Sequence, residues 1–153
     1  MSRYKVAHHP AVLSCIGLGS CIGIVLYDAV KKMGGLAHVM LPRRKDGRNQ
    51  SNPGRFADSA IEYMLDEMER QGSARRNIHA KIFGGANMFP GIATGLLLSI
   101  GEKNIAATRE ELNRRKIKIV AEDLGGHFGR TIVFDTEDGL VRVRNVRGEE
   151  NVY

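Results

Sequence analysis

Short runs of apolar and β-branched residues alternate along the chain with glycine-containing turns, a pattern typical of strands joined by tight connections. In the first third of the chain, such runs predict strands at residues 11–15, 22–27 and 36–41, with a turn at residues 28–35 between the last two. Pro42 ends the third strand because proline has no N–H to donate to a neighbouring strand. Similar runs predict four further strands, at residues 80–83, 117–121, 131–134 and 140–146.

Two segments instead carry apolar residues at three- and four-residue intervals, the spacing of one face of a helix. The first helix is expected to begin near Asn52 and Pro53, which suit a cap and a first turn, and to end before Gly72. Its apolar stripe comprises Phe56, Ala60, Ile61, Met64, Leu65 and Met68. A second helix is predicted at about residues 102–115. Its buried residues are expected to be Ile105, Ala106 and Leu112.

Strands outnumber helices in this pattern, and they come largely in hairpins. One hairpin connection, at residues 135–139, ends in a glycine suited to a positive φ. The order of elements therefore favours the α+β class with a mostly antiparallel sheet rather than repeated βαβ units. A chain of 153 residues is long enough to bury a core of its own, so we expect a single domain over residues 1–153.

The formal net charge of +6 and a pI near 9.6 raise nucleic acid as a possible partner. The basic residues are spread along the chain, however, and none of the basic stretches is interleaved with aromatic residues that would stack on bases. This distribution favours a solvated, mildly basic surface. An acidic protein partner attracted by that charge is the next interpretation, and nucleic acid comes third.

The remaining composition indicates the compartment. No apolar run approaches the roughly 18–20 residues that a membrane helix requires, and residues 1–10 lack the apolar core of a secretory signal. The chain has two cysteines, which form no disulfide framework. We therefore expect a cytoplasmic protein without membrane insertion, in which both thiols stay reduced.

Both cysteines lie in the glycine-rich stretch LSCIGLGSCIG, residues 13–23. A dinucleotide-binding loop is excluded because Ile22 stands where the third glycine of G-x-G-x-x-G is needed, and a strand-like run follows in place of a helix. A disulfide is disfavoured by the expected compartment. A structural zinc would need four ligands, for which Cys15, Cys21, His38 and His127 are candidates, but the C-x-x-C spacing of such sites is absent.

A reactive nucleophile is the fourth interpretation of this stretch. The small residues Gly19 and Ser20 precede Cys21, so backbone N–H groups there can approach a bound carbonyl and stabilise an oxyanion. A free cysteine is also commonly a small buried hydrophobe. The residues around Cys21 do not decide between these two interpretations.

The base that a nucleophilic thiol requires has one candidate near this stretch. His38 lies in the otherwise apolar run at residues 36–41, which is the hairpin partner of the strand that begins next to Cys21. In an antiparallel pair, opposed residues have numbers with a constant sum. An odd sum, such as 59 or 61, puts Cys21 and His38 on one face, whereas an even sum puts them on opposite faces. The sequence leaves this parity open.

Several later motifs accompany the glycine-cysteine stretch: GLAHVMLP at residues 35–42, NPGRFAD at 52–58, KIFGGANMF at 81–89, IGEKN at 100–104 and EDLGGHFGRT at 122–131. Together these segments resemble the CheD family of chemoreceptor glutamine deamidases. The resemblance spans nearly the whole chain. It implies a layered α/β/β/α sandwich with mostly antiparallel strands, similar to the cysteine-histidine catalytic domains of deamidase toxins.

The resemblance also implies roles for particular residues. Cys21 matches the nucleophile and His38 the general base, with backbone N–H groups near Gly19, Ser20 and Cys21 as oxyanion donors. The family's third catalytic residue is a threonine, and its position corresponds to Cys15 in this chain. A thiol orients an imidazole less well than a hydroxyl does. Leu124 is a second departure, since a threonine is expected before Gly125. His127 is interpreted as a surface or pocket-edge residue.

The activity that the resemblance implies is hydrolysis of glutamine side chains to glutamate on the cytoplasmic helices of methyl-accepting chemotaxis receptors. Hydrolysis of glutamate methyl esters is chemically equivalent and is also expected. A CheC-type phosphatase is the implied partner, and neither a cofactor nor a metal is expected. The alternative is an adaptor that binds receptor helices and the phosphatase without catalysis, which the departure at Cys15 keeps open.

Overall fold

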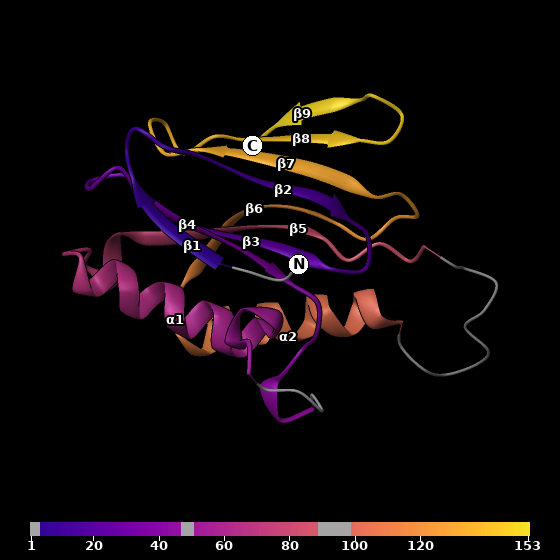
Figure 1. Ribbon diagram of the computed structural model, residues 1–153, viewed down its shortest axis with the longest axis horizontal. Coiled ribbons are helices and arrows are strands. Elements are labelled where there is room, and N and C mark those ends of the chain that lie inside the picture. Colours follow the sequence, from indigo (N-terminus) through magenta and orange to yellow (C-terminus); the bar gives the residue numbers. More distant parts are fainter. Residues whose placement is uncertain (1–3, 47–50, 89–98) are drawn as a thin grey trace.

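The computed structural model of the protein describes residues 4–46, 51–88 and 99–153, and shows two β-sheets and a helical layer (Figure 1). The five-stranded sheet consists, in spatial order, of β1 (Tyr4–His8), β4 (Met33–Val39), β3 (Ile22–Asp28), β5 (Ile78–Gly84) and β6 (Lys118–Leu124). The four-stranded sheet consists of β2 (Val12–Leu18), β7 (Arg130–Asp135), β8 (Val141–Asn145) and β9 (Glu150–Val152). The helices are α1 (Ala57–Arg70) and α2 (Ile100–Arg114), with short 3₁₀ turns at Arg44–Asp46, Pro53–Arg55 and Arg75–Asn77.

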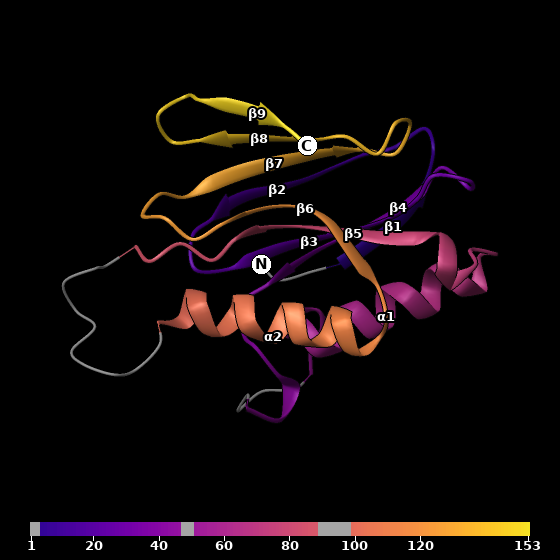
Figure 2. The same cartoon turned by 180° about the vertical axis from the view of Figure 1, so that it is seen from behind.

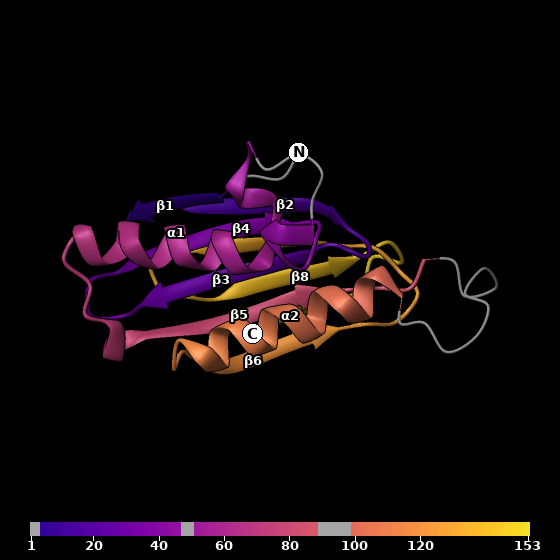
Figure 3. The same ribbon diagram turned by 90° about the horizontal axis from the view of Figure 1, so that it is seen from below.

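The layers follow one another as helices, five-stranded sheet and four-stranded sheet. Both helices cover the same face of the five-stranded sheet (Figure 3), and the four-stranded sheet covers its other face (Figure 2). The α+β class with mostly antiparallel sheets is confirmed. Of the four layers that the resemblance implied, the described residues form these three, and the outer face of the four-stranded sheet carries exposed charged side chains such as Arg142 and Arg144.

One pair of strands departs from the antiparallel expectation. β5 and β6 are parallel, and α2 lies between them in the chain. This part of the molecule is therefore a βαβ unit, which the sequence interpretation had set aside. Parallel strands need a long crossover, and the second predicted helix supplies it.

β3 is the centre of the molecule because it is buried on both faces. Ile22, Ile24 and Leu26 pack toward the helices, whereas Val25 and Tyr27 pack toward the four-stranded sheet. Strands covered on both sides read as continuous apolar runs, which is why the sequence shows no alternation there. The site described below begins one residue before this strand.

The first helix follows its predicted pattern. All six residues of the apolar stripe are fully buried. Asn52 caps the preceding 3₁₀ turn by accepting the N–H of Gly54 at 3.1 Å, so α1 itself starts later, at Ala57. Gly72 follows the helix with a φ of +100°, as an exit glycine should.

The second helix buries a more polar face than the sequence suggested. Leu112 is buried and Ile105 is half-buried, but Ala106 is exposed, so that part of the prediction is wrong. The buried face includes Asn104 and Thr108, both at 0% exposure. Because these polar residues occupy inward positions, the apolar periodicity assigned the buried face incorrectly.

The β3–β4 turn is shorter than predicted. Asp28 accepts the N–H groups of Val30 and Lys31 through Oδ1, and β4 already begins at Met33. Gly34 lies inside β4, where a Cβ atom would stand 2.3 Å from the ring of Phe134. This glycine therefore serves close packing of the two sheets rather than the turn.

Two short edge strands, β1 and β9, were not predicted from the sequence. Each pairs with a single neighbour, β1 with β4 and β9 with β8. Neither has a fully buried face of its own, so the apolar pattern that marks interior strands is missing. In the described ranges, no helix is long and apolar enough to cross a membrane.

Candidate active site

Cys21 and His38 lie on the same face of the five-stranded sheet. In the β3–β4 pair the numbers of opposed residues add to 61, as in Ile22 opposite Val39 and Gly23 opposite His38. Cys21 immediately precedes β3, so strand alternation makes it a diagonal neighbour of His38. The odd sum answers the parity question that the sequence left open.

That shared face looks toward the four-stranded sheet. Leu36, two residues before His38, belongs to the apolar cluster between the sheets, and Cys21 packs against the same cluster. Cys15 joins this cluster from β2, where it stands opposite Ile132. Cys21 and His38 therefore face the space between the two sheets from one side, and Cys15 faces it from the other.

Cys15 and His38 line a cavity of about 650 Å³ between the facing edges of the two sheets. Its mouth is formed by Tyr4 and Lys5 of β1, and by Val12 and Ile16 of β2. Both of these β2 side chains are exposed, Ile16 to 76%. The cavity thus offers an apolar rim with one lysine and leads to the Cys15 thiol and the His38 imidazole, whereas Cys21 is not one of its lining residues.

Burial sets the protonation states of these groups. Desolvation raises the pKa of the Cys21 thiol and lowers the pKa of the His38 imidazole. It also raises the pKa of Cys15 to about 12, with the neighbouring Cys21 adding to the effect. At neutral pH the pair is therefore a neutral thiol and a neutral imidazole rather than a preformed ion pair.

We expect the alkylation rate of Cys21 by iodoacetamide to rise with pH along a curve whose midpoint lies above 9.0, the ordinary thiol value. Only the thiolate reacts, and burial disfavours that charged form. The rate is followed by mass spectrometry of the Cys21 peptide, with the Cys15 peptide as internal comparison. A midpoint below 9.0 would contradict the neutral resting pair.

His38 has the free nitrogen that a base needs. Its Nε2 atom is buried and has no hydrogen-bond partner among the described residues. Such a buried polar atom is costly unless a ligand or water satisfies it. Cys15 makes no hydrogen bond to His38 in the described part of the chain, and both cysteines are free thiols.

The segment Gly19–Ser20–Cys21 is fixed in place by hydrogen bonds that its carbonyl groups accept. Gly19 accepts from the N–H of Ala86 and Cys21 from the N–H of Gly85, both at 2.8 Å. Ser20 accepts from the side-chain amide of Asn104 at 2.9 Å. Within the described ranges, the N–H groups of this segment donate to no protein acceptor, so they remain available to an oxyanion.

The turn that holds this segment requires glycine. Gly84 has a φ of +112°, and a Cβ atom there would lie 2.2 Å from the carbonyl oxygen of Cys21. Arg130 secures the same turn, since its guanidinium donates to the carbonyls of Gly84, Asp123 and Gly125, each at 2.9 Å. Sequence reasoning did not assign Arg130 or Asn104 a role, although both lie in motifs that carried the resemblance.

The remaining sequence candidates lie outside this cluster. His127 is exposed, and its Nδ1 atom is 3.1 Å from the carbonyl oxygen of Asn87, which agrees with a surface position. Leu124 ends β6 and packs against the helix-side core. Among the described residues, no three histidine, cysteine or acidic side chains gather as a metal site requires, so the four-ligand zinc set is not assembled.

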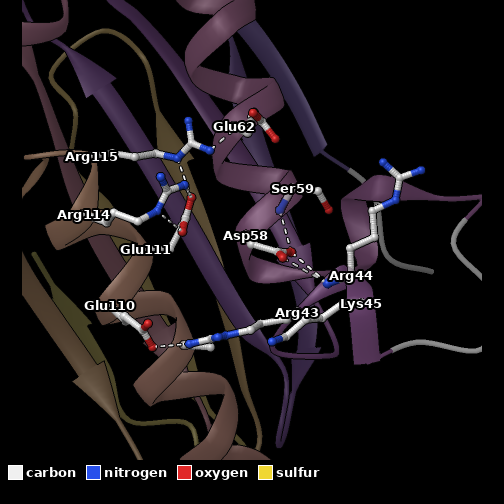
Figure 4. Close-up of a pocket in the computed structure, with 11 residues that line it drawn as sticks. Arg43, Arg44, Lys45, Asp58, Ser59, Glu62, Glu110, Glu111, Arg114 and Arg115 are labelled. Atoms are coloured by element: carbon white, nitrogen blue, oxygen red, sulfur yellow. Dashed lines mark hydrogen bonds and ion pairs between the residues drawn. The ribbon is translucent and has the colours of Figure 1, made fainter.

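A second cavity, of about 390 Å³, lies on the helix side and is lined largely by charged residues (Figure 4). Most of these charged side chains form ion pairs with one another. Arg43 pairs with Glu110, and both Arg114 and Arg115 pair with Glu111. Asp58 accepts the backbone N–H of Arg44 (Figure 4). This network fastens the two helices and the 3₁₀ turn on the face of the sheet remote from Cys21.

The fold and the site together define a class of α+β protein with two facing sheets, in which a cysteine and a histidine share the inner face of one sheet. Residues 40–145 match the family described as CheD chemotactic sensory transduction. The chain belongs to the CheD family.

Curated relatives agree with this assignment over nearly the whole chain. One from Clostridium novyi is 49% identical over 142 residues, covering 93% of this chain and 88% of that protein. One from Desulforamulus reducens is 47% identical, covering 95% of this chain and 88% of that protein, and one from Thermococcus kodakarensis is 41% identical, covering 94% and 88%. Each of these is named a probable chemoreceptor glutamine deamidase CheD.

Proposed function

We propose that the protein, acting as one domain over residues 1–153, is a hydrolase that converts glutamine side chains of chemotaxis receptors to glutamate. The observation that carries the proposal is the buried, unpartnered Nε2 of His38 on the same face as Cys21. The names of the relatives point to the same activity and to chemoreceptors as the class of substrate.

The reaction proceeds in two halves. His38 accepts the proton of Cys21, and the thiolate attacks the glutamine carboxamide carbon. The free N–H groups of the Gly19–Cys21 segment stabilise the resulting oxyanion. The tetrahedral intermediate collapses as the imidazolium protonates its amide nitrogen and the carbon–nitrogen bond breaks, which releases ammonia and leaves a thioester. His38 then takes a proton from water, hydroxide attacks the thioester, and Cys21 regains its proton as glutamate is released.

The same steps apply to a glutamate methyl ester, with methanol leaving in place of ammonia. Receptor helices rich in acidic residues would be attracted by the net charge of +6. We propose these helices, in the cytoplasm, as the substrate and a CheC-type phosphatase as a regulatory partner.

The direct test incubates the purified protein with a recombinant cytoplasmic fragment of a methyl-accepting chemoreceptor. We expect ammonia release together with the mass gain of glutamine-to-glutamate conversion, localised by peptide mapping. A folded protein that binds the fragment and yields no converted glutamine would contradict the proposal.

The adaptor alternative rests on Cys15. A thiol whose pKa is raised to about 12 is a weak hydrogen-bonding group, so it orients the His38 imidazole poorly. We expect Cys15→Thr to increase kcat by about three- to tenfold, the value of one added hydrogen bond. Conversion at or below the wild-type rate in a folded Cys15→Thr protein would show that a cysteine at position 15 does not limit the deamidation rate. Binding of the fragment without conversion by either protein would favour the adaptor.

A further inference from the structure

Asn104 is a fully buried residue of α2 that contacts the ends of both strands carrying the proposed catalytic pair. Its Nδ2 atom donates to the carbonyl oxygen of Ser20 at 2.9 Å and to that of Met40 at 3.0 Å. Ser20 immediately precedes Cys21, and Met40 lies two residues after His38. One amide group thus uses both of its donors to join these two strand ends.

The bond to Ser20 fixes the direction of the next N–H group. In a trans peptide, the C=O of one residue and the N–H of the next lie in one plane and point in opposite directions. Among the described residues, only the His9–Pro10 peptide is cis. Because the Ser20 carbonyl points to Asn104 on α2, the N–H of Cys21 points away from α2. The Cys21 side chain also faces away from the helices, toward the four-stranded sheet.

Asn104 differs from the other groups that hold this segment. The carbonyls of Gly19 and Cys21 are bound by backbone N–H groups, whereas Ser20 is bound by a side chain. The Oδ1 atom of Asn104 is buried without a partner in the described residues, which makes an amide an unfavourable choice for packing alone. An apolar residue at this position would lack the two N–H donors of the Asn104 amide.

We propose that Asn104 is a positioning residue that aims the N–H of Cys21 at the oxyanion of the tetrahedral intermediate. The inference rests on the proposed deamidase function. Asn104 itself touches no substrate and acts through the Ser20–Cys21 peptide. With the Ser20 carbonyl released, that peptide can rotate, and the oxyanion then loses one aligned donor.

The test compares the wild type with Asn104→Leu and the nearly isosteric Asn104→Asp, using the receptor fragment as substrate. We expect kcat to fall by about 10- to 100-fold, somewhat less than when an oxyanion donor is removed outright, with KM within about twofold of wild type. Alkylation of Cys21 by iodoacetamide forms no oxyanion, so its rate should stay within about threefold of wild type. Asn104→Ser keeps one donor and should retain more activity than Asn104→Leu.

Thr108→Val is the matched control. Thr108 lies one turn further along α2, is equally buried and has an unpartnered hydroxyl, but it makes no bond to the segment. Its variant should keep the wild-type kcat. Unchanged kcat in folded Asn104 variants, or alkylation that falls in parallel with kcat, overturns the role of Asn104 while conversion by the wild type upholds the deamidase. No conversion by the wild type overturns both.

Discussion

Cys21→Ala is expected to abolish glutamine conversion, with a fall in kcat of at least about 10⁴-fold, as when the nucleophile of a hydrolase is removed. The thiol is half-buried at the edge of the inter-sheet core, so its replacement by alanine removes little packing. The melting temperature should therefore stay close to that of the wild type. The measurement is the initial rate of ammonia release on the receptor fragment, with peptide mapping of the converted glutamines.

Two variants make this result specific. Cys15→Ala removes the other thiol, and it should keep far more activity than Cys21→Ala because the proposed mechanism gives Cys15 no bond to the substrate. Cys21→Ser keeps a polar group of similar size and should still be inactive, since a hydroxyl is a much weaker acid than a thiol. Substantial conversion by Cys21→Ala would place the chemistry elsewhere in the molecule.

His38→Gln is expected to lower kcat at neutral pH by about 10²- to 10⁴-fold, the usual contribution of a general base. In the wild type, kcat/KM should fall as the pH decreases through the pKa of His38. Since burial lowers that pKa below its ordinary value of 6.5, the acid limb should have its midpoint below pH 6.5. The variant should lose this limb, and its residual activity should rise toward alkaline pH as the Cys21 thiolate forms without help.

His79→Gln is the matched control for this variant. His79 is also a half-buried strand histidine whose pKa is lowered by burial, but it stands opposite Tyr27 at the far end of β3. The His79→Gln variant should leave kcat and the acid limb of the pH profile unchanged. An equal loss in both variants would mean that general destabilisation, rather than a missing base, explains the effect.

Much of the architecture could be predicted from the sequence because its elements have strong periodic signals. The stripe of α1 and the apolar run of β3 report burial directly, and both predictions are confirmed. The prediction of the buried face of α2 was less accurate. Asn104 and Thr108 are buried although both are polar, so a pattern of apolar residues does not reveal them. The edge strands β1 and β9 gave no signal, since a strand with one neighbour and no fully buried face lacks a marked pattern.

The candidate site, too, could be predicted from the sequence only in part. The glycine-cysteine stretch and the histidine in an apolar strand could be recognised, but whether Cys21 and His38 share a face depends on a turn length that the sequence does not fix. The position of Cys15 depends on how the two sheets pack, which is a contact between segments that do not pair with one another. The role of Asn104 depends on hydrogen bonds to the carbonyls of Ser20 and Met40, which are distant in sequence, and Arg130 binds the equally unforeseen carbonyl of Gly84.

The location of Cys21 at the start of β3 has a consequence for how the protein loses its activity. β3 is hydrogen-bonded to β4 on one side and β5 on the other, and all seven of its residues are buried. Amide hydrogens in such a strand exchange with solvent only when most of the molecule opens. The proposed nucleophile is thus anchored next to the strand expected to open last, whereas β1 and β2 at the cavity mouth are sheet edges. Fluctuations that widen the cavity mouth can occur at those edges while Cys21 and His38 keep their alignment.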